Sequence, residues 1–257
     1  MTQATSTTLQ SLESAAFAAW PSALSDDING WRLRLDRGYT KRANSANATA
    51  QSQKLSDADI DSIEAQFRQR DLTPTFRLTS FAPISEADAL LAQRGYLHFD
   101  LSLVMTRPLA DTDTDTDTDG SAGPALAGSS ERWLEAFRDV SGKSGADQAV
   151  HLDILRRIAH PCAWAVQARA GSPLSCGLGV LVDRNLGLFD IATRESHQRQ
   201  GLGRQVCREM LSWGRERGAD TAFLQVLAAN HAAVRLYEGL GFQVAYKYWY
   251  RVQAPLL

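Results

Sequence analysis

The sequence predicts an α/β protein of the α+β kind, in which a mixed, mostly antiparallel sheet is flanked by helices. The second half of the chain carries a helical pattern, three strand-like segments, and then a helix, a strand, a short helix and a final strand. Short turn sequences separate the three strand-like segments, so neighbouring strands are expected to pair as an antiparallel meander. At 257 residues the chain is long enough for two modest domains.

Apolar periodicity and turn residues place each element of the second half. One face of the long helix is apolar, and Gly218 suits its left-handed end. Asn230 is expected to cap the short helix that runs to Glu238. The expected elements are the helix Glu131–Val140, the strands Cys162–Arg169, Cys176–Asp183 and Leu186–Thr193, the helix carrying Leu202, Val206, Met210 and Trp213, the strand Thr221–Leu227, the capped helix and the strand Gln243–Arg251.

The first half of the chain shows a similar but weaker pattern. A helix from Ser85, the segment Arg94-Gly95-Tyr96 and a strand Phe99–Met105 follow the same order as the last helix, Gly241-Phe242 and the last strand. The other expected elements are the strand Trp31–Leu35, a helix near Ile60–Arg70 and the strand Thr75–Thr79.

Composition limits the class of protein. Hydrophobic residues make up 44% of the chain and charged residues 22%, so a sizeable core is expected and wholesale disorder is excluded. No apolar run approaches the roughly 20 residues that span a bilayer, and the polar first residues do not resemble a signal peptide. Three cysteines without a CxxC spacing predict reduced thiols and no metal site. We therefore expect a cytoplasmic protein that does not bind a membrane.

A low-complexity segment divides the chain. Asp and Thr alternate from Asp111 to Asp119 and small residues follow, which predicts a linker over residues 111–130 between domains at 1–110 and 131–257. The last part holds 16 basic and 12 acidic residues, and 14 of the 16 are arginine, the side chain best shaped for phosphate. An anionic ligand is expected. Nucleic acid is not, because the excess is modest and no basic stretch is interleaved with aromatic residues.

A glycine-containing loop precedes the long helix of the second half. The segment Arg199-Gln200-Gly201-Leu202-Gly203-Arg204 lies between a strand and a helix start, where free amides and the helix dipole favour a phosphate group. A glycine turn that merely relieves steric strain is the alternative for such a segment taken alone.

A second motif follows about 30 residues later, at Asn230 and at Tyr237-Glu238-Gly239-Leu240-Gly241-Phe242. With both motifs in register, the run from Phe189 to Phe242 resembles the GCN5-related N-acetyltransferase superfamily, called GNAT below. The domain that carries the resemblance, 131–257, makes up about half the chain. The resemblance implies the GNAT fold and, with the weaker pattern of the first half, two GNAT-like domains in tandem, of which 1–110 is degenerate and lacks the glycine loop and 131–257 is catalytic.

The resemblance implies acetyl-CoA as the acyl donor. The amides of residues 199–204 would hold the pyrophosphate. The strand residues Ile191, Ala192 and Thr193 would line the pantetheine arm with their backbone groups, and Asn230 would bind the same arm. Tyr237 would be the general acid that protonates the departing thiolate; the alternative is a packed aromatic side chain.

The general base is left open. Some GNAT members that acetylate protein N-termini have a glutamate where this chain has Gln225, which cannot accept a proton at neutral pH. Asp190 is the nearest replacement, and a salt bridge is its alternative role. Glu195 and His197 lie in the following loop and are weaker candidates. The basic stretch from Tyr39 to Asn44 either faces the acceptor or forms a polar edge of the first domain.

These features predict an enzyme that moves the acetyl group of acetyl-CoA to a primary amine of a small metabolite or amino-acid-like acceptor by direct attack. A protein lysine or N-terminal acetyltransferase is one alternative. A sensor that binds acyl-CoA without turnover is the other, and the tyrosine at position 237 favours activity over it. A monomer is expected, because the tandem layout supplies internally the contacts that single-domain members make as dimers.

Overall fold

The structure is a computed structural model of the chain, and it describes residues 6–49, 52, 54–82, 84–109, 124–142 and 147–254. Within these ranges, no helix is both long and apolar enough to cross a membrane. Residues 110–123, which contain most of the expected linker, lie outside the described residues.

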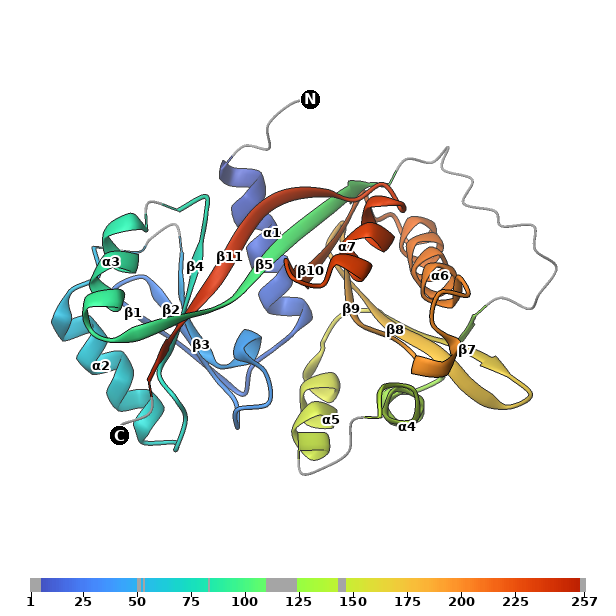
Figure 1. The fold of residues 1–257 in the computed structure, drawn as a ribbon, viewed down its shortest axis with the longest axis horizontal. Coiled ribbons are helices and arrows are strands. Elements are labelled where there is room, and N and C mark those ends of the chain that lie inside the picture. Colours follow the sequence, from blue (N-terminus) through green and yellow to red (C-terminus); the bar gives the residue numbers. More distant parts are fainter. Residues whose placement is uncertain are drawn as a thin grey trace.

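Eleven strands of the described chain form one sheet in the order β1-β2-β3-β4-β11-β5-β10-β9-β8-β7-β6 (Figure 1). All neighbouring strands are antiparallel except the pairs β3–β4 and β10–β9, so the predicted mixed, mostly antiparallel sheet flanked by helices is confirmed. The strands are β1 (Leu24–Ile28), β2 (Trp31–Leu35), β3 (Ser45–Ala48), β4 (Thr75–Thr79), β5 (Tyr96–Pro108), β6 (Ala125–Leu126), β7 (Cys162–Arg169), β8 (Ser172–Val182), β9 (Asn185–Thr193), β10 (Thr221–Leu227) and β11 (Gln243–Gln253).

The helices cover both faces of this sheet. The helices α1, α4 and α5 close over one face of β8 and β9, and α6 and α7 pack on the other face. A separate core lies between α2, α3 and the strands β2 to β4. The helices are α1 (Ser6–Ala19), α2 (Asp57–Arg68), α3 (Ser85–Gln93), α4 (Ser130–Ser141), α5 (Asp147–Arg157), α6 (Leu202–Glu216) and α7 (His231–Glu238), with short 3₁₀ turns η1 (Lys41–Ala43) and η2 (Glu195–His197).

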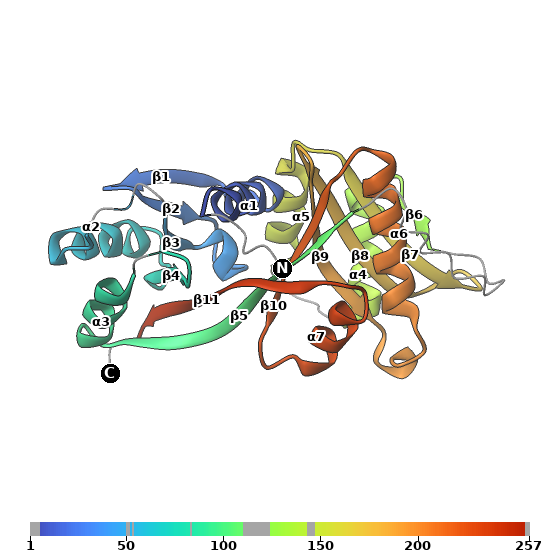
Figure 2. The same cartoon turned by 90° about the horizontal axis from the view of Figure 1, so that it is seen from above.

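The long strands β5 and β11 join the two parts of the chain. Figure 2 shows them running together from the α2 and α3 end of the molecule to the α7 end. β5 lies between β11 and β10, and β11 also pairs with β4. The expected linker 111–130 thus separates, in sequence, the strand β5 from its two sheet partners β10 and β11.

The structure adds elements that the sequence analysis did not assign, namely α1, β1, β3 and α5. It also lengthens β8, which begins at Ser172 because Ala170 and Gly171 both take positive φ in a tight hairpin turn. The end of the expected linker is not a linker: β6 pairs with β7, and the Ser129 side chain caps α4.

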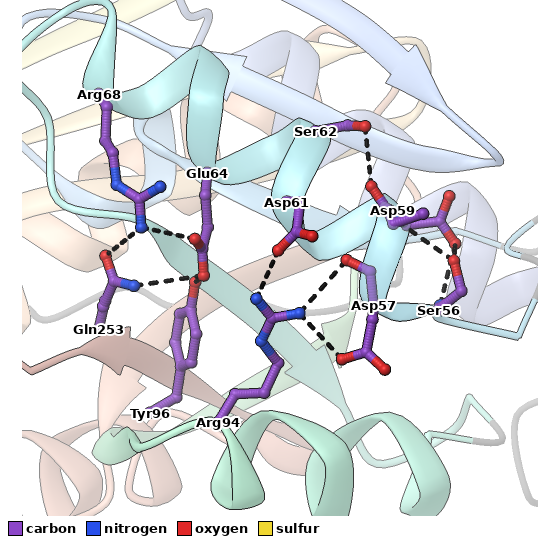
Figure 3. A network of polar contacts seen from close by, with 11 residues as sticks. Ser56, Asp57, Asp59, Asp61, Ser62, Glu64, Arg68, Arg94, Tyr96 and Gln253 are labelled. Atoms are coloured by element: carbon purple, nitrogen blue, oxygen red, sulfur yellow. Dashed lines mark hydrogen bonds and ion pairs between the residues drawn. The ribbon is translucent and has the colours of Figure 1, made fainter.

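A network of polar contacts fastens α2 to its neighbours (Figure 3). Arg94, at the end of α3, donates to Asp57 and Asp61 of α2. Glu64 of α2 accepts from the Tyr96 hydroxyl at the start of β5, 2.8 Å away, and from the Gln253 amide of β11. The last strand is thereby tied to the first half of the chain.

A buried ion pair ties α1 to the middle of the sheet. The Arg77 guanidinium of β4 donates to Glu13 of α1 at 2.5 and 2.9 Å, and the Tyr246 hydroxyl of β11 donates to the same carboxylate. The Arg77 and Glu13 side chains are 3% and 9% exposed. Burial by itself lowers the pKa of Arg77, but the Glu13 charge, the hydrogen bonds to Glu13 and the nearby tyrosines together outweigh burial and raise the pKa above its ordinary value.

We expect Glu13→Ala to lower the free energy of unfolding by about 3–5 kcal/mol, because it leaves the Arg77 charge buried without its partner. Urea unfolding at pH 7 measures this value. Asp220→Ala is the matched control, since it breaks the solvent-exposed pair with Arg184 and should leave the unfolding midpoint nearly unchanged. Equal effects of the two variants would contradict the role given to the buried pair.

Candidate active site

The strands β9 and β10 part halfway along their length. Their parallel ladder runs from the pair Asn185–Thr221 to the pair Leu188–Leu224 and stops there. Beyond this point β9 stays paired with β8, and β10 stays paired with β5 as far as Leu227. The carboxyl ends of β9 and β10 therefore face each other without pairing.

A β-bulge lies on β9 where the opening begins. The register with β8 shifts between Cys176 and Leu178, so that Asp190 and Ile191 stand opposite one residue of β8. Asp190 takes a φ of +46°, which re-aims its side chain relative to a regular strand. Its Oδ2 lies 2.9 Å from Nε2 of His151, and its Oδ1 lies 3.8 Å from a guanidinium nitrogen of Arg42.

The glycine loop leads into α6 at the same end of the sheet. Arg199 and Gly201 have φ values of +59° and +82°, and α6 begins at Leu202. The first amides of a helix have no intrahelical acceptor, so this turn presents N–H groups to an anion. A Cβ at position 203 would come 3.3 Å from Oγ1 of Thr193, so a larger residue there would press on Thr193 and narrow the space between loop and strand.

These elements enclose a hollow of about 400 Å³, called the α6 hollow below. It gathers most of the predicted donor-binding residues and Tyr237 from three separate segments of the chain. The lining residues are Ile191, Thr193, Gln198, Arg199, Gly201, Leu202, Gly203, Arg204, Asn230, Ala232, Ala233, Leu236 and Tyr237. Gln200 is exposed and does not line it.

A second hollow of about 550 Å³, the α4 hollow, adjoins the first and shares Ile191, Thr193 and Gln198 with it. Its lining is Phe137, Val140, Ser141, Asp190, Ile191, Ala192, Thr193, Glu195 and Gln198. The two predicted residues Asp190 and Ala192 lie here and not in the α6 hollow. Glu195 reaches this lining and His197 does not.

Two of the predicted binding residues already have partners. The Asn230 side-chain oxygen accepts from the Ala233 amide at 3.1 Å, which confirms the predicted cap of α7. The Arg204 guanidinium donates to the Gly239 carbonyl at 3.0 Å, so its side chain is held against the end of α7.

Tyr237 is buried at the wall of the α6 hollow. Its residue is 8% exposed and its ring packs edge to face on Phe242. Burial raises the pKa of Tyr237 above its ordinary value. The phenol therefore keeps its proton over the whole physiological range, as a general acid must.

His151 is the main residue of this region that the sequence analysis missed. It lies on the unassigned helix α5, is 2% exposed, and its Nδ1 lies 3.0 Å from the Tyr39 hydroxyl. A histidine among the apolar positions of the segment 147–157 was the one available signal, and nothing nearby in the sequence distinguishes it from a core residue. Gln225, by contrast, accepts from the Tyr248 hydroxyl at 3.4 Å.

The three cysteines are unpaired, as predicted. Burial raises the pKa of Cys207, on α6, to about 12, and burial together with the Asp190 charge does the same for Cys176 on β8. Cys162 is half-buried, and its pKa is also raised to about 12 by burial. None is a candidate nucleophile.

The parted strands, the bulge and the helix-start loop define an N-acetyltransferase of the GNAT superfamily, and the chain is an acetyl-transferring enzyme. Residues 5–251 match the family model described as "Probable histone acetyltransferase Rv0428c C-terminal", and the chain belongs to that family.

Similar proteins agree with this assignment. The chain is 29% identical over 250 residues to the uncharacterized N-acetyltransferase YobR of Bacillus subtilis, covering 95% of this chain and 98% of that one. It is 47% identical over 58 residues to the ribosomal protein bS18-alanine N-acetyltransferase of Escherichia coli, which is 23% of this chain and 39% of that one. The solved GCN5-related N-acetyltransferase from Kribbella flavida shares the fold with a TM-score of 0.71 at 16% identity over 96% of each chain.

We expect Cys176 and Cys207 to resist Ellman's reagent in the folded protein at pH 8, because a thiol with a pKa near 12 is ionised only to about one part in ten thousand there. Absorbance at saturating reagent should show all three thiols only after unfolding in guanidinium. Fast reaction of more than one thiol in the native protein would contradict this expectation. If the protein thiols do not react, the reagent can also be used to measure the free thiol of CoA that the enzyme releases.

Proposed function

We propose that the enzyme transfers the acetyl group of acetyl-CoA to a primary amine of a small metabolite or amino-acid-like acceptor. The observation that carries the proposal is the α6 hollow, in which the glycine loop, the free end of β9 and Tyr237 line one continuous space. This space adjoins the α4 hollow, where an acceptor amine has room beside Asp190.

The donor would be held mainly by backbone groups. Amides of residues 199–204 are the proposed ligands of the pyrophosphate. The Ala192 carbonyl accepts from the Ser175 hydroxyl and the Arg194 amide donates to the Leu174 carbonyl, so both point toward β8. Backbone groups alternate along a strand, and those of Ile191 and Thr193 therefore turn toward the opening, where the pantetheine arm is proposed to lie.

The proposed reaction is direct attack of the amine nitrogen on the thioester carbonyl carbon. The new C–N bond forms, the C–S bond breaks, and Tyr237 protonates the leaving thiolate. Asp190 is the proposed group that draws a proton from the acceptor ammonium. Its partners His151 and Arg42 also give it the salt-bridge character considered above, and the two roles are compatible.

A protein acceptor is the second candidate. It is favoured by the 58-residue similarity to the bS18-alanine N-acetyltransferase, whose name specifies a protein substrate. Gln225 weighs against an N-terminal acetyltransferase of the type that uses a glutamate there. A screen of amino acids, polyamines and short peptides with free N-termini, each followed by mass spectrometry, separates the two candidates.

The setting proposed for this activity is the cytoplasm, where the three unpaired thiols stay reduced. We also propose that the enzyme acts as a monomer without nucleic acid.

We expect calorimetric titration to show acetyl-CoA binding to the wild-type protein and none to Gly201→Glu, which places a carboxylate and bulk at the proposed pyrophosphate position. Gly201→Ala is the matched control. It brings the same strain at a φ of +82° without the charge, and no atom lies within 4 Å of its Cβ. Absence of binding to the wild type, or equal loss in both variants, would contradict the proposed donor site.

We expect Tyr237→Phe to lower kcat for the best amine of the screen by about 10²–10⁴-fold, because the thiolate would leave without its acid. The dissociation constant of acetyl-CoA should stay within about twofold, since the ring and its packing on Phe242 are kept. Undiminished turnover would exclude Tyr237 as the acid. A sensor would show binding and no turnover in either protein.

A further inference from the structure

The buried imidazole of His151 connects two segments that are far apart in the sequence. Its Nε2 lies 2.9 Å from Oδ2 of Asp190 on β9, and its Nδ1 lies 3.0 Å from the hydroxyl of Tyr39, in the loop between β2 and η1. The Tyr39 and His151 rings also stack, with centroids 4.8 Å apart. Both ring nitrogens thus face an oxygen atom that can exchange a proton.

Aromatic rings surround the rest of the imidazole. The rings of Trp20, Trp133 and Phe137 lie 5.7, 6.2 and 5.3 Å from it, centroid to centroid. A polar ring in such an apolar place costs free energy unless both its nitrogens are satisfied. The Tyr39 hydroxyl fills this requirement for Nδ1, whereas Nε2 makes no hydrogen bond and lies at ion-pair distance from the Asp190 carboxylate.

The loop that carries Tyr39 is held rigidly against α5. The Asn44 side chain accepts from the Asp36 and Gly38 amides and donates to the Thr40 carbonyl. Arg157 of α5 forms an ion pair with the buried Asp36 carboxylate. Contacts from both sides therefore fix where the Tyr39 hydroxyl stands.

His151 lies between two hollows. Asp190 lines the α4 hollow, whereas His151 and Tyr39 line a third hollow of about 270 Å³, the α5 hollow, which shares Phe137 with the α4 hollow. The α5 hollow is lined by Tyr39, Leu134, Phe137, Arg138, Gly142, Asp147, Gln148 and His151. The path Asp190, His151, Tyr39 leads from one hollow to the other.

Amine acetylation releases a proton that such a path can carry away. An acceptor ammonium loses two protons when it becomes an amide; one ends on the CoA thiol and the other must leave the site. A path from Asp190 to the α5 hollow removes the second proton from the space that the acceptor occupies and frees the carboxylate for the next acceptor.

We propose that Asp190, His151 and Tyr39 form a proton relay that serves the acceptor amine, an inference that rests on the proposed function. The ammonium N–H bond breaks and an O–H bond forms on Asp190. That proton then passes to Nε2 of His151, giving a carboxylate and an imidazolium. The proton that Nδ1 already carries then passes to the Tyr39 oxygen while the Tyr39 O–H proton goes to the α5 hollow, which leaves a neutral imidazole protonated on Nε2. Return of the ring to its Nδ1–H tautomer after product release completes the cycle.

The charges near His151 suit this task. The Asp190 carboxylate on β9 stabilises the imidazolium, and Asp147 at the start of α5 lies at the same hollow as the exit. The Arg42 guanidinium of η1 and the Arg138 side chain of α4 oppose it, which favours release of the proton. Burial, followed by the Asp190 charge, raises the pKa of Tyr39, so its hydroxyl stays protonated and able to relay.

The first test needs no acceptor. The histidine rings of the full chain are labelled with ¹⁵N. Their NMR signals are followed from pH 5 to 9, with and without acetyl-CoA. With Asp190→Asn the ¹⁵N shift of Nε2 of His151 should change, because the carboxylate beside that nitrogen becomes an amide. With Tyr39→Phe the ring shifts of the neutral form should change. His151 signals that ignore both substitutions would overturn the relay.

The second test is a pH profile of kcat/KM for the best amine of the screen. His151→Gln should lower the rate about 10–100-fold at pH 7, with recovery toward pH 9, where more of the amine arrives already neutral. Tyr39→Phe should show the same trend more weakly and guards against a folding defect in the glutamine variant. His98→Gln, on β5 and outside all three hollows, is the matched control.

A rate lowered equally at every pH would indicate a structural role for His151 and overturn the relay. Failure of the wild type to acetylate any amine would instead overturn the proposed function, and the NMR titration would still report on the relay by itself.

Discussion

The parting of β9 from β10 is the constraint on which the rest of the site depends. Parallel strands that stayed paired to Thr193 would satisfy each other's backbone groups and close the space in front of α6. Because the ladder stops at Leu188 and Leu224, the backbone of the last β9 residues faces an open space instead of a neighbouring strand. Backbone polar groups in such a position are satisfied by solvent or by a ligand, and an extended ligand arm is well suited to them.

The opening stays open because each of its sides has its own support. β9 is held by β8, across the bulge at Asp190, and β10 is held along its whole length by β5. β5 comes from the first part of the chain, so without that part β10 would lose its partner on the side away from β9. The buried Glu13–Arg77–Tyr246 cluster ties β11 to α1 and β4, and the Glu64–Gln253 contact ties it to α2. The first part of the chain therefore shapes the site even where it does not line it.

What the sequence could predict follows from the range of the interactions concerned. The β9–loop–α6 segment and the β10–α7 segment are continuous in sequence, and their turn and cap residues act on near neighbours, so their positions were predicted correctly. The expected first and last residues of β10, Thr221 and Leu227, are those found in the structure. The place of β5 between β10 and β11 depends on pairing across more than a hundred residues, for which neither periodicity nor turn chemistry gives a signal.

The same reasoning explains why His151 escaped notice. It contacts Tyr39, 112 residues earlier, and Asp190 on a strand that follows α5. The sequence of its own helix shows only an ordinary amphipathic pattern. The basic stretch from Tyr39 to Asn44 was considered as an acceptor-facing element without a way to decide. In the structure this stretch brings Tyr39 beside His151 of α5 and Arg42 beside Asp190 of β9.

The meeting of the β2–η1 loop, α5 and β9 bears on which acceptor the enzyme takes. The proposed donor side of the opening is built from contiguous motifs of the second part of the chain. The proposed acceptor side draws on α4, α5, β9 and the β2–η1 loop, which meet only in the folded protein. Changes in the β2–η1 loop or in α5 can therefore alter the acceptor and its proton path without disturbing the donor loop, the parted strands or Tyr237. Chains that keep the motifs from Phe189 to Phe242 are for this reason expected to share a donor and to differ in the amine that they accept.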